Sequence, residues 1–525
     1  MSNPTKYISI GRDAGLSNLF TDHISEIGSY AAVFSEIEKK CMANKEFPNR
    51  RVLVDCLTKQ YKESGIELGG LVHENIKALA DTNTFTVTTG HQLCVFSGPL
   101  YVIHKILSAV HTCNELNRIN KKCRFVPVYW MATEDHDIEE ISHLNIFREK
   151  FSVEFSSSGT SGMLNSGDVI KHMDRLKELA GDLPFAGEIL DIINDCYRDG
   201  VLLKHAHRKF IHALMGQLGI VILDGDEPAL KKIFRNVFHD ELTNQVVTEL
   251  VTVQNKELAK KGYAPQVNSR AINLFLLSKG ARNRIEKDGE NFILVDTNRK
   301  IKKEEMVDLV NNQPETISPN VLLRPLYQCT VLPDVALVGG PAEIGYWRQL
   351  DKLFEKYNVV MPLRIPRLFA FYVNDKQYSL YSEIEKEKLG LFSPETEWAS
   401  AWAKKQAAYA SFEKEKKELD STYASLSMKA SEVDKSLIAF IASEKSRSEK
   451  FLTSLDEKII RSLKKNSENE MNALHQLHVK LFPEGSWQER HESALPYLWK
   501  YGKNFVNEIL AEMPASVNHC ALINK

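Results

Sequence analysis

Short apolar and β-branched runs punctuate the first half of the chain. Thr84–Thr89 (TFTVTT), Arg124–Ala132 (RFVPVYWMA) and Gly219–Leu223 (GIVIL) have the length and composition of buried strands. Between the first two runs, Leu100–Leu116 carries apolar residues at helical spacing. A strand, a helix and a second strand in this order are typical of a βαβ unit, whose strands lie parallel. The pattern therefore predicts an α/β fold built on a parallel sheet.

Two stretches interrupt this alternation and predict insertions, near 151–200 and near 242–320. The first contains Ser156–Asp182, whose Ser, Gly and Asp residues predict a surface insertion or mobile loop. The second predicts a helix and then a hairpin of Ala271–Leu277 and Arg284–Val295 around Asp288-Gly289. The sheet resumes at Val335–Val338, which Gly339-Gly340-Pro341 joins to a helix ending near Tyr357.

A change in composition marks a separate helical region. From Glu395 to Phe482 the chain has neither Gly nor Pro. A heptad repeat runs through it at Phe412, Leu419, Leu426, Val433 and Phe440. The region predicts one long helix or an αα-hairpin with arms of roughly 60 Å, with Ser431 and Asp434 available for a turn and a new cap. We expect a Rossmann-like core with insertions over 1–375, a coiled-coil domain over 376–483 and a C-terminal helical segment, 484–525, that returns to the core.

Composition and charge narrow the class of protein. Of 525 residues, 43% are hydrophobic and 26% are charged, which is typical of globular proteins. Lys and Arg (67) nearly balance Asp and Glu (69), so no general electrostatic footprint for nucleic acid is present. No apolar run approaches the roughly 20 residues that span a bilayer, and residues 1–11 do not resemble a signal peptide. The eight cysteines contain no C-x-x-C pair. We therefore expect reduced thiols in a cytoplasmic protein without membrane or nucleic-acid partners.

The first candidate site follows the first predicted strand. Thr89, Gly90, His91 and Gln92 end that strand, and Gly98 precedes the next helix. Free backbone N–H groups and glycines at such a loop favour an anion, although a plain tight turn explains the glycines as well. No phosphate-binding glycine motif is present. Lys105 is interpreted as a solvated charge, and no base is identifiable beside Cys94.

The second candidate follows the second predicted strand. Glu134, Asp135, His136 and Asp137 crowd three carboxylates and an imidazole at its carboxyl end. Such a cluster suits an ammonium group, a metal ion or general acid–base catalysis, and we assign these four residues a catalytic role. The alternative is an acidic helix N-terminus capped by Thr133. No histidine spacing supports a metal site.

The third candidate surrounds the last strand. Gly339 and Gly340 join this strand to a helix whose first turn holds Glu343, a carboxylate that favours an amine or hydroxyl over phosphate. The same region contributes further candidate binding residues: Arg324, Tyr346 and Trp347. A tight turn with a capping acid is the alternative interpretation. Because all three candidates follow predicted parallel strands, we expect His91, Asp135 and Glu343 to line one pocket at the rim of the sheet.

These motifs, read together, resemble the bacillithiol biosynthesis cysteine-adding enzyme family. The resemblance rests on TGHQLCVFSGPLYVIHK, PVYWMATEDHDIEE and SPNVLLRPLYQCTVLPDVALVGGPAEIGYW, with NLFLLSKGARNRIE and LFPEGSWQERHESALPYLWKYG as further segments. It implies a Rossmann-like core akin to nucleotidyltransferases and class I aminoacyl-tRNA synthetases, interrupted by connecting insertions, and a coiled coil that supports a homodimer. Three positions depart from the family pattern: His91, Ile138 and Ala342.

The resemblance also implies an activity. The family task is a ligation that joins L-cysteine to the amine of glucosaminyl-malate to form the low-molecular-weight thiol bacillithiol. Since amide formation from a free carboxylate is uphill, the core suggests activation by ATP with Mg²⁺. In this hypothesis the loop of Thr89–Gln92 and Gly98 holds phosphates, and Arg324 grips the malate carboxylates. The sequence contains no K-M-S-K-S loop.

Two other functions remain open at this point. One is a non-catalytic nucleotide-fold scaffold that dimerises through its coiled coil. The other is a hydrolase acting on an amino-sugar, with Glu134 and Asp137 as paired acids.

Overall fold

The computed structural model describes residues 5–9, 30–278, 280–387, 389–514 and 519–525. These residues divide into two compact units. One unit contains 5–371 and 489–523, and the other contains 372–488 with 524–525. No helix within the described residues combines the length and the apolar character needed to cross a bilayer.

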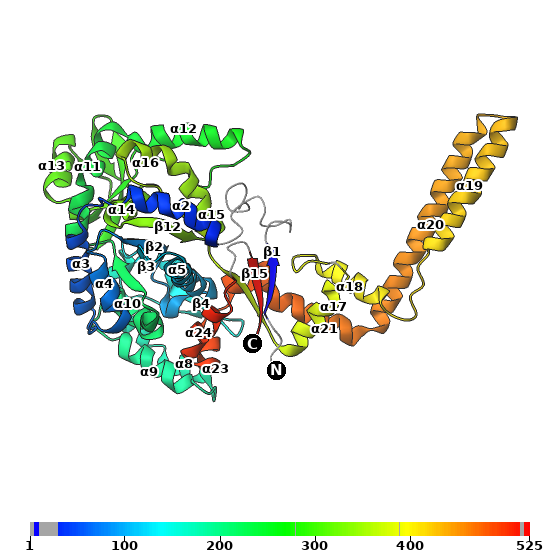
Figure 1. The fold of residues 1–525 in the computed structure, drawn as a ribbon, viewed down its shortest axis with the longest axis horizontal. Coiled ribbons are helices and arrows are strands. Elements are labelled where there is room, and N and C mark those ends of the chain that lie inside the picture. The colour runs from blue at the N-terminus through cyan, green and yellow to red at the C-terminus, as the bar shows by residue number, and fades with distance from the viewer. Residues whose placement is uncertain (1–4, 10–29, 279, 388, 515–518) are drawn as a thin grey trace. The chain divides into compact units, whose positions relative to one another are not determined.

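A five-stranded parallel sheet forms the centre of the first unit (Figure 1). Its strands are β2 (Thr84–His91), β3 (Arg124–Met131), β6 (Val221–Asp224), β12 (Asp334–Gly339) and β13 (Leu363–Pro366). The spatial order is β13-β12-β2-β3-β6, and every neighbouring pair is parallel. The α/β prediction is confirmed, and four of these strands coincide with predicted ones. The fifth strand, β13, is a strand that the sequence analysis missed.

The order of the strands creates a switch point. From the central β2 the chain adds β3 and β6 on one side and then returns to add β12 and β13 on the other. Between β2 and β12, connections therefore leave in opposite directions, and a crevice opens at the carboxyl ends of these two strands. In open α/β sheets this crevice is where ligands bind.

Helices cover both faces of the sheet, whose strands are almost entirely buried, as is usual for a parallel sheet. The helix α5 (Leu100–Ile119) packs against β2, β3 and β12, while α3 (Arg50–Glu63), α4 (Gly70–Ala78) and α10 (Leu203–Met215) contact β6. The remaining helices of this layer are α2 (Tyr30–Ala43), α11 (Pro228–Asn244), α14 (Arg324–Val331), α15 (Pro341–Trp347) and α16 (Asp351–Tyr357).

The first predicted insertion is packed rather than mobile. It contains β5 (Glu149–Ser152), α7 (Gly167–Ile170), α8 (Met173–Ala180) and α9 (Ala186–Cys196), and it follows α6 (Ile138–Ser142) and β4 (His143–Ile146). Ser161 and Asp168 are buried, and the Ser161 amide donates to the carbonyl oxygen of Asp135 at 2.6 Å. The segment reaches the surface, where residues such as Lys171 and Asp182 are exposed, but it forms short helices in place of an irregular loop.

The second insertion is a small antiparallel sheet of order β10-β9-β8-β7-β11. After α12 (Val246–Lys260) come β7 (Leu274–Ser278), β8 (Ala281–Asp288), β9 (Asn291–Leu294), β10 (Arg299–Ile301), α13 (Lys303–Asn312) and β11 (Ile317–Pro319). The turn at Asp288-Gly289 occurs as predicted, and it joins β8 to β9. The predicted Arg284–Val295 segment accordingly contains the end of β8 and all of β9.

Residues 489–523 of the C-terminal segment complete the first unit. The segment forms α22 (Gln488–His491), α23 (Leu495–Tyr501), α24 (Asn504–Ala511) and β15 (His519–Asn524), and β15 pairs antiparallel with β1 (Lys6–Ser9). The helix α24 packs against α5. The segment is thus helical as predicted, except for its final strand.

The second unit is helical (Figure 1). After β14 (Phe369–Val373), which crosses from the first unit, it contains α17 (Asp375–Glu385), α18 (Glu395–Lys404), α19 (Glu413–Val433), α20 (Leu437–Asn466) and α21 (Glu468–Leu481). The helices α19 and α20 form the predicted hairpin. Asp434 ends α19, and its carboxylate accepts a hydrogen bond from the amide of Ser436 at 2.8 Å.

The hairpin is shorter than predicted. The 21 residues of α19 span about 31 Å, roughly half of the expected arm. None of the described residues of α19 and α20 is buried, and Val433 and Phe440 are 84% and 64% exposed. The predicted heptad crosses the turn, so these two residues do not share one helix. Dimerisation through this hairpin remains a prediction.

Candidate functional site

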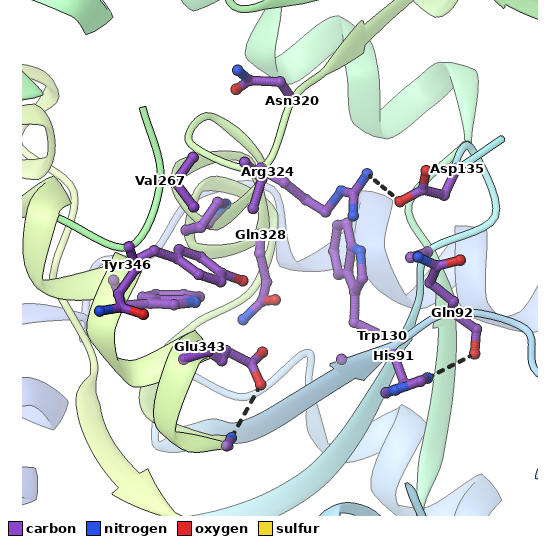
Figure 2. Close-up of a pocket in the computed structure, with 18 of the residues that line it drawn as sticks. His91, Gln92, Trp130, Asp135, Val267, Asn320, Arg324, Gln328, Glu343 and Tyr346 are labelled. Carbon is purple, nitrogen blue, oxygen red and sulfur yellow. Dashed lines mark hydrogen bonds and ion pairs between the residues drawn. The ribbon is translucent and has the colours of Figure 1, made fainter. Parts of the chain in front are cut away.

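A cavity of about 840 Å³ opens at the switch point of the parallel sheet (Figure 2). Its walls come from the ends of β2 and β3, from the first turns of α14 and α15, and from the antiparallel sheet of the second insertion. His91, Asp135 and Glu343 all line it. The three predicted motifs therefore converge on one cavity, since each follows a strand of the same parallel sheet.

The first motif contributes Gly90, His91 and Gln92. The His91 ring lies with Nε2 2.8 Å from the Tyr101 hydroxyl and Nδ1 3.2 Å from the Gln92 carbonyl oxygen. Burial, reinforced by Lys105, lowers the pKa of His91 to about 3, so the ring is neutral. In the neutral ring Nδ1–H donates to Gln92 and Nε2 accepts from Tyr101, so both nitrogens are paired and His91 brings no positive charge to the cavity.

Thr89 and Gly98 do not reach the cavity, and the predicted anion cradle is wrong for both. The Thr89 hydroxyl is buried and donates to the Val338 carbonyl oxygen at 2.9 Å. Gly98 has a φ of 63°, and a Cβ there would lie 2.6 Å from the Cβ of Cys94. Its conformation thus serves a close backbone approach.

A histidine does lie beside Cys94, contrary to prediction. The Cys94 Sγ lies 3.7 Å from the His91 Nδ1. Burial nevertheless raises the pKa of the Cys94 thiol to about 12. The thiol stays protonated, which argues against a role as nucleophile.

Of the four residues predicted to be catalytic, Asp135 lines the cavity and the other three do not. Glu134 is buried, with a carboxylate oxygen 2.6 Å from the Lys231 ammonium. Asp137 is the exposed N-cap of α6 and accepts the Glu140 amide at 3.1 Å. The side chain of His136 is 48% exposed. The prediction is therefore wrong for Glu134 and Asp137, and the hydrolase alternative loses its paired acids.

Asp135 lies between two arginines. One carboxylate oxygen is 3.5 Å from the Arg282 guanidinium and the other is 3.6 Å from that of Arg324, an ion pair drawn in Figure 2. Burial opposes ionisation of Asp135, but the two guanidinium groups outweigh it and hold its pKa below the usual range. Asp135 is therefore a stable anion suited to binding a cation, and a weak proton acceptor.

The third motif contributes Gly340, Glu343, Tyr346 and Trp347, whereas Gly339 lies outside the lining. Glu343, Tyr346 and Trp347 are three and four residues apart on α15, so they share one face of that helix. The Glu343 carboxylate is 2.7 Å from the Lys105 ammonium.

Lys105 was predicted to be a solvated charge, and this was wrong. It is 6% exposed and lines the cavity. Its ammonium also donates to the carbonyl oxygen of Gly90, so it ties the first motif to the third. A lysine on the buried face of α5 can be accommodated because Glu343 neutralises it.

The second insertion supplies residues that sequence reasoning missed. Arg282 and Arg284 are two apart on β8, so they share one face of the strand, and both line the cavity. Arg282 donates to the Pro319 carbonyl oxygen at 2.9 Å and stacks on Phe275 at 3.9 Å. Two charged residues at alternate positions of a predicted strand were the signal that could have revealed this wall.

Positive charge dominates the lining. Seven cationic side chains line the cavity against three carboxylates. The cations are Lys105, Arg270, Arg282, Arg284, Arg324, Arg367 and Arg490, and the acids are Asp135, Glu140 and Glu343. Within the described part of the chain, Arg284 and Arg490 have no carboxylate partner. Such a lining favours an anionic ligand that also carries a group for a carboxylate to bind.

A buried network supports one end of this wall. Glu489 is fully buried and lies 2.6 Å from the Arg367 guanidinium and 2.8 Å from the His104 Nδ1. Arg367 in turn stacks over Tyr101 at 5.2 Å. Glu489, which lies outside the cavity lining, thus holds the Arg367 side chain at the cavity wall.

Glu489→Gln is expected to destabilise the protein by about 2–3 kcal/mol at pH 7. Burial disfavours the Glu489 anion, but Arg367 and His104 outweigh burial and lower its pKa from 4.5 to about 2. Because this pKa is depressed, the stabilisation is present above pH 4.5 and is lost as the pH falls toward 2. Denaturant titrations at pH 7 and at pH 3 measure the change, and a difference that is independent of pH would contradict it.

The described residues contain no group of three or more His, Cys, Asp or Glu side chains able to hold a metal ion. Asp135 is occupied by arginines and Glu343 by lysine. A metal in this cavity would therefore depend on ligands brought by a substrate.

Two family models cover nearly all of the chain. Bacillithiol biosynthesis BshC, N-terminal Rossmann-like domain, matches residues 4–368. Bacillithiol biosynthesis BshC, C-terminal coiled-coil domain, matches residues 370–523.

Similar proteins come from several bacterial groups, and each of these carries the name "Putative cysteine ligase BshC". A relative from Cytophaga hutchinsonii is 35% identical over 92% of each chain. One from Flavobacterium psychrophilum is 33% identical over 96% of this chain and 97% of its own. One from Bacillus cytotoxicus is 27% identical over 89% of each. On these matches, which agree with the Rossmann-like sheet and the helical hairpin, the chain belongs to the bacillithiol biosynthesis BshC family.

Proposed function

We propose that this protein is a cysteine ligase that joins the carboxyl group of L-cysteine to the amine of glucosaminyl-malate, forming bacillithiol. The names of its relatives support the cysteine ligase part of this proposal. The observation that carries the proposal is the mixed lining of the cavity, in which arginines surround Asp135, Glu140 and Glu343. Malate supplies two carboxylates for the arginines, and the amines of both substrates suit the three acids.

Arg324 is the residue to which we assign the malate group. It begins α14, and its side chain reaches the Asp135 carboxylate from the cavity wall. Gln328 lies one turn further along α14 and also lines the cavity. A guanidinium can hold a carboxylate through two parallel hydrogen bonds, which orients the substrate as well as binding it.

Glu140 is the residue to which we assign proton transfer. Burial raises the pKa of Glu140, and the neighbouring carboxylates of Asp137 and Asp135 raise it further. Its carboxylate also accepts a hydrogen bond from the Gln92 side chain at the rim of the first motif. As the amine nitrogen forms the new bond to the cysteine carbonyl carbon, Glu140 takes the proton that nitrogen loses.

ATP with Mg²⁺ is the activating reagent that we propose. When bound, ATP supplies the phosphate or adenylyl group that turns the hydroxyl of the cysteine carboxyl into a leaving group. The uncommitted guanidinium groups of Arg284 and Arg490 fit phosphate charge. The cradle predicted from Thr89 and Gly98 does not fit, because neither residue faces the cavity. Mg²⁺ would depend on phosphate oxygens for its ligands, since the described residues offer no cluster for it.

The test is a reaction with purified protein, cysteine, glucosaminyl-malate and ATP, followed by chromatography of the thiol product and of AMP and ADP. Bacillithiol formation that requires ATP is the expected result. Release of malate or of free sugar without ATP would favour a hydrolase, and ligand binding without turnover would favour a scaffold. We further propose a homodimer formed through the hairpin of α19 and α20, which ultracentrifugation of the full chain tests.

Asp135→Ala is expected to lower kcat/KM at least tenfold, because Arg282 and Arg324 then lose the anion that holds them in place. Glu139→Ala is a matched control, since Glu139 is an exposed acid on the neighbouring helix α6 and does not line the cavity. Full activity of Asp135→Ala in the same assay would remove this residue from the site.

A further inference from the structure

A buried carboxylate lies outside the cavity and has no cationic partner among the described residues. Glu241, in the last turn of α11, is 0% exposed. One of its oxygens accepts the Val247 amide at 2.9 Å, and the other accepts two N–H groups of Asn273. Burial raises the pKa of Glu241 to about 7 even though these donors favour the anion. Burying a carboxylate without a cation is costly, so its contacts call for an explanation.

Asn273 links Glu241 to the cavity wall, because it is hydrogen-bonded both to Glu241 and to Asn320. Its backbone amide and side-chain amide both donate to Glu241, at 2.9 and 2.8 Å. Its side-chain oxygen accepts the Nδ2 of Asn320 at 2.8 Å, and its carbonyl oxygen accepts the backbone amide of Asn320 at 3.1 Å. The side-chain amide of Asn273 donates to Glu241 and also to the Arg270 carbonyl oxygen at 2.7 Å, so Asn273 can present only its oxygens to Asn320.

Asn320 lines the cavity and lies in the turn that leads into α14, the helix that begins at Arg324 (Figure 2). Its side-chain oxygen accepts the amides of Leu322 and Leu323 at 3.0 and 3.2 Å. Its carbonyl oxygen accepts the amide of Arg324 at 2.9 Å. Asn320 therefore satisfies three backbone donors at the start of α14 that would otherwise lack partners.

We propose that Glu241 is a positioning residue, which acts through Asn273 and Asn320 to hold the first turn of α14, and with it Arg324, at the cavity wall. In its kinetic consequence this inference rests on the proposed function, because Arg324 is there assigned to the malate group. The structural consequence, a first turn of α14 held in place by Glu241, does not depend on the proposed function. Each step of the chain is a hydrogen bond between buried or half-buried groups, and in the first step the acceptor is an oxygen of the Glu241 carboxyl group.

The first test is hydrogen exchange of the backbone amides of residues 322–324 in the full chain without ligand, measured by mass spectrometry. Glu241→Leu removes both oxygens and is expected to speed this exchange about tenfold or more. Glu241→Gln is expected to stay close to the parent protein, because its single oxygen can still accept from Asn273. Asp240→Ala is the matched control, since Asp240 lies in the same turn and instead bonds Tyr357 and Asn244. Equal exchange in Glu241→Leu and the parent overturns the proposal.

A second variant covers the case in which Glu241→Leu does not fold. Asn320→Asp replaces the Nδ2 donor with an oxygen that faces the Asn273 oxygen, while the acceptor for Leu322 and Leu323 remains. Asn320→Asp is expected to speed the same amide exchange. The double variant with Glu241→Leu is expected to exchange little faster than either single variant, because both substitutions interrupt the same series of hydrogen bonds. Fully additive effects contradict the proposal.

Steady-state kinetics separate this inference from the proposed function. Glu241→Leu is expected to raise KM for glucosaminyl-malate about tenfold with kcat within threefold, and Glu241→Gln to restore the parent KM. Faster exchange in a protein that makes no bacillithiol leaves the positioning role standing and removes the ligase. If the Glu241→Leu protein is an active ligase whose amide exchange and KM are unchanged, the ligase activity stands and the positioning role of Glu241 is removed.

Discussion

Arg324→Ala is expected to lower kcat/KM for glucosaminyl-malate by about 100- to 1,000-fold. The loss corresponds to about 3–4 kcal/mol, the usual cost of removing one partner of a buried charge pair that also binds substrate. Arg324 faces the cavity and pairs with Asp135 at 3.6 Å, so the change removes a substrate contact and leaves Asp135 to Arg282 alone. The measurement is the rate of bacillithiol formation as a function of glucosaminyl-malate concentration at saturating cysteine and ATP.

Two further variants separate charge from geometry and from folding. Arg324→Lys keeps the charge but loses the planar fork, and it is expected to recover only part of the activity. Arg175→Ala is the control, because this arginine pairs with Glu178 at 2.7 Å on an exposed helix away from the cavity. If Arg324→Ala stays within about threefold of the parent protein while remaining folded, the assignment of the malate group to Arg324 is wrong.

The parallel sheet could be predicted from sequence because its strands are buried on both faces. TFTVTT and GIVIL are continuous apolar or β-branched runs, the pattern of a strand covered by helices on each side. The edge strand β13 was missed because Leu363–Pro366 is only four residues long and mixes Arg364 and Pro366 with apolar residues. At the edge of the sheet, half of its backbone groups need no partner strand, so a weaker signal is sufficient for pairing.

The heptad pattern predicted the helical hairpin but not its dimensions. Asp434 ends α19 as a capping residue, and Ser431 precedes the turn. Nevertheless the spacing from Val433 to Phe440 continues across the turn, and periodicity alone does not distinguish a continued helix from a new one. The contact between Lys445 and Asp420 at 2.7 Å, which links the two helices, depends on a register that only the folded hairpin fixes.

The position of the candidate site could be predicted, whereas the identity of its side chains could not. Loops that follow parallel strands meet at one edge, and this places His91, Asp135 and Glu343 together. Beyond the strand end, however, no periodicity determines which side chain faces inward. Adjacent residues Glu134 and Asp135 point to different partners, Lys231 and the two arginines. The arginines of β8 are missed for another reason, because an insertion far along the chain folds back over the site.

Lys231→Met is expected to destabilise the protein by about 3–5 kcal/mol, the second large effect that the structure predicts. The Lys231 side chain is 0% exposed, and its ammonium lies 2.6 Å from both Glu134 and Asp226. It also donates to the Glu315 carbonyl oxygen at 3.0 Å. Methionine fills a similar volume but leaves the buried Glu134 and the half-buried Asp226 without a cation. Unfolding by denaturant, followed by tryptophan fluorescence, measures the loss.

The interpretation of this loss depends on two comparisons. Lys59→Met removes the more exposed partner of an ion pair with Glu227 at 3.0 Å, and it is expected to cost about 1 kcal/mol or less. Adding Glu134→Leu to Lys231→Met removes one stranded carboxylate and is expected to recover part of the stability, which a mere packing defect at Lys231 would not allow. If the double variant is no more stable than Lys231→Met, the buried Glu134 carboxylate is not stabilised by Lys231. The ion pair with Lys231 would then no longer be a reason to exclude Glu134 from a catalytic role.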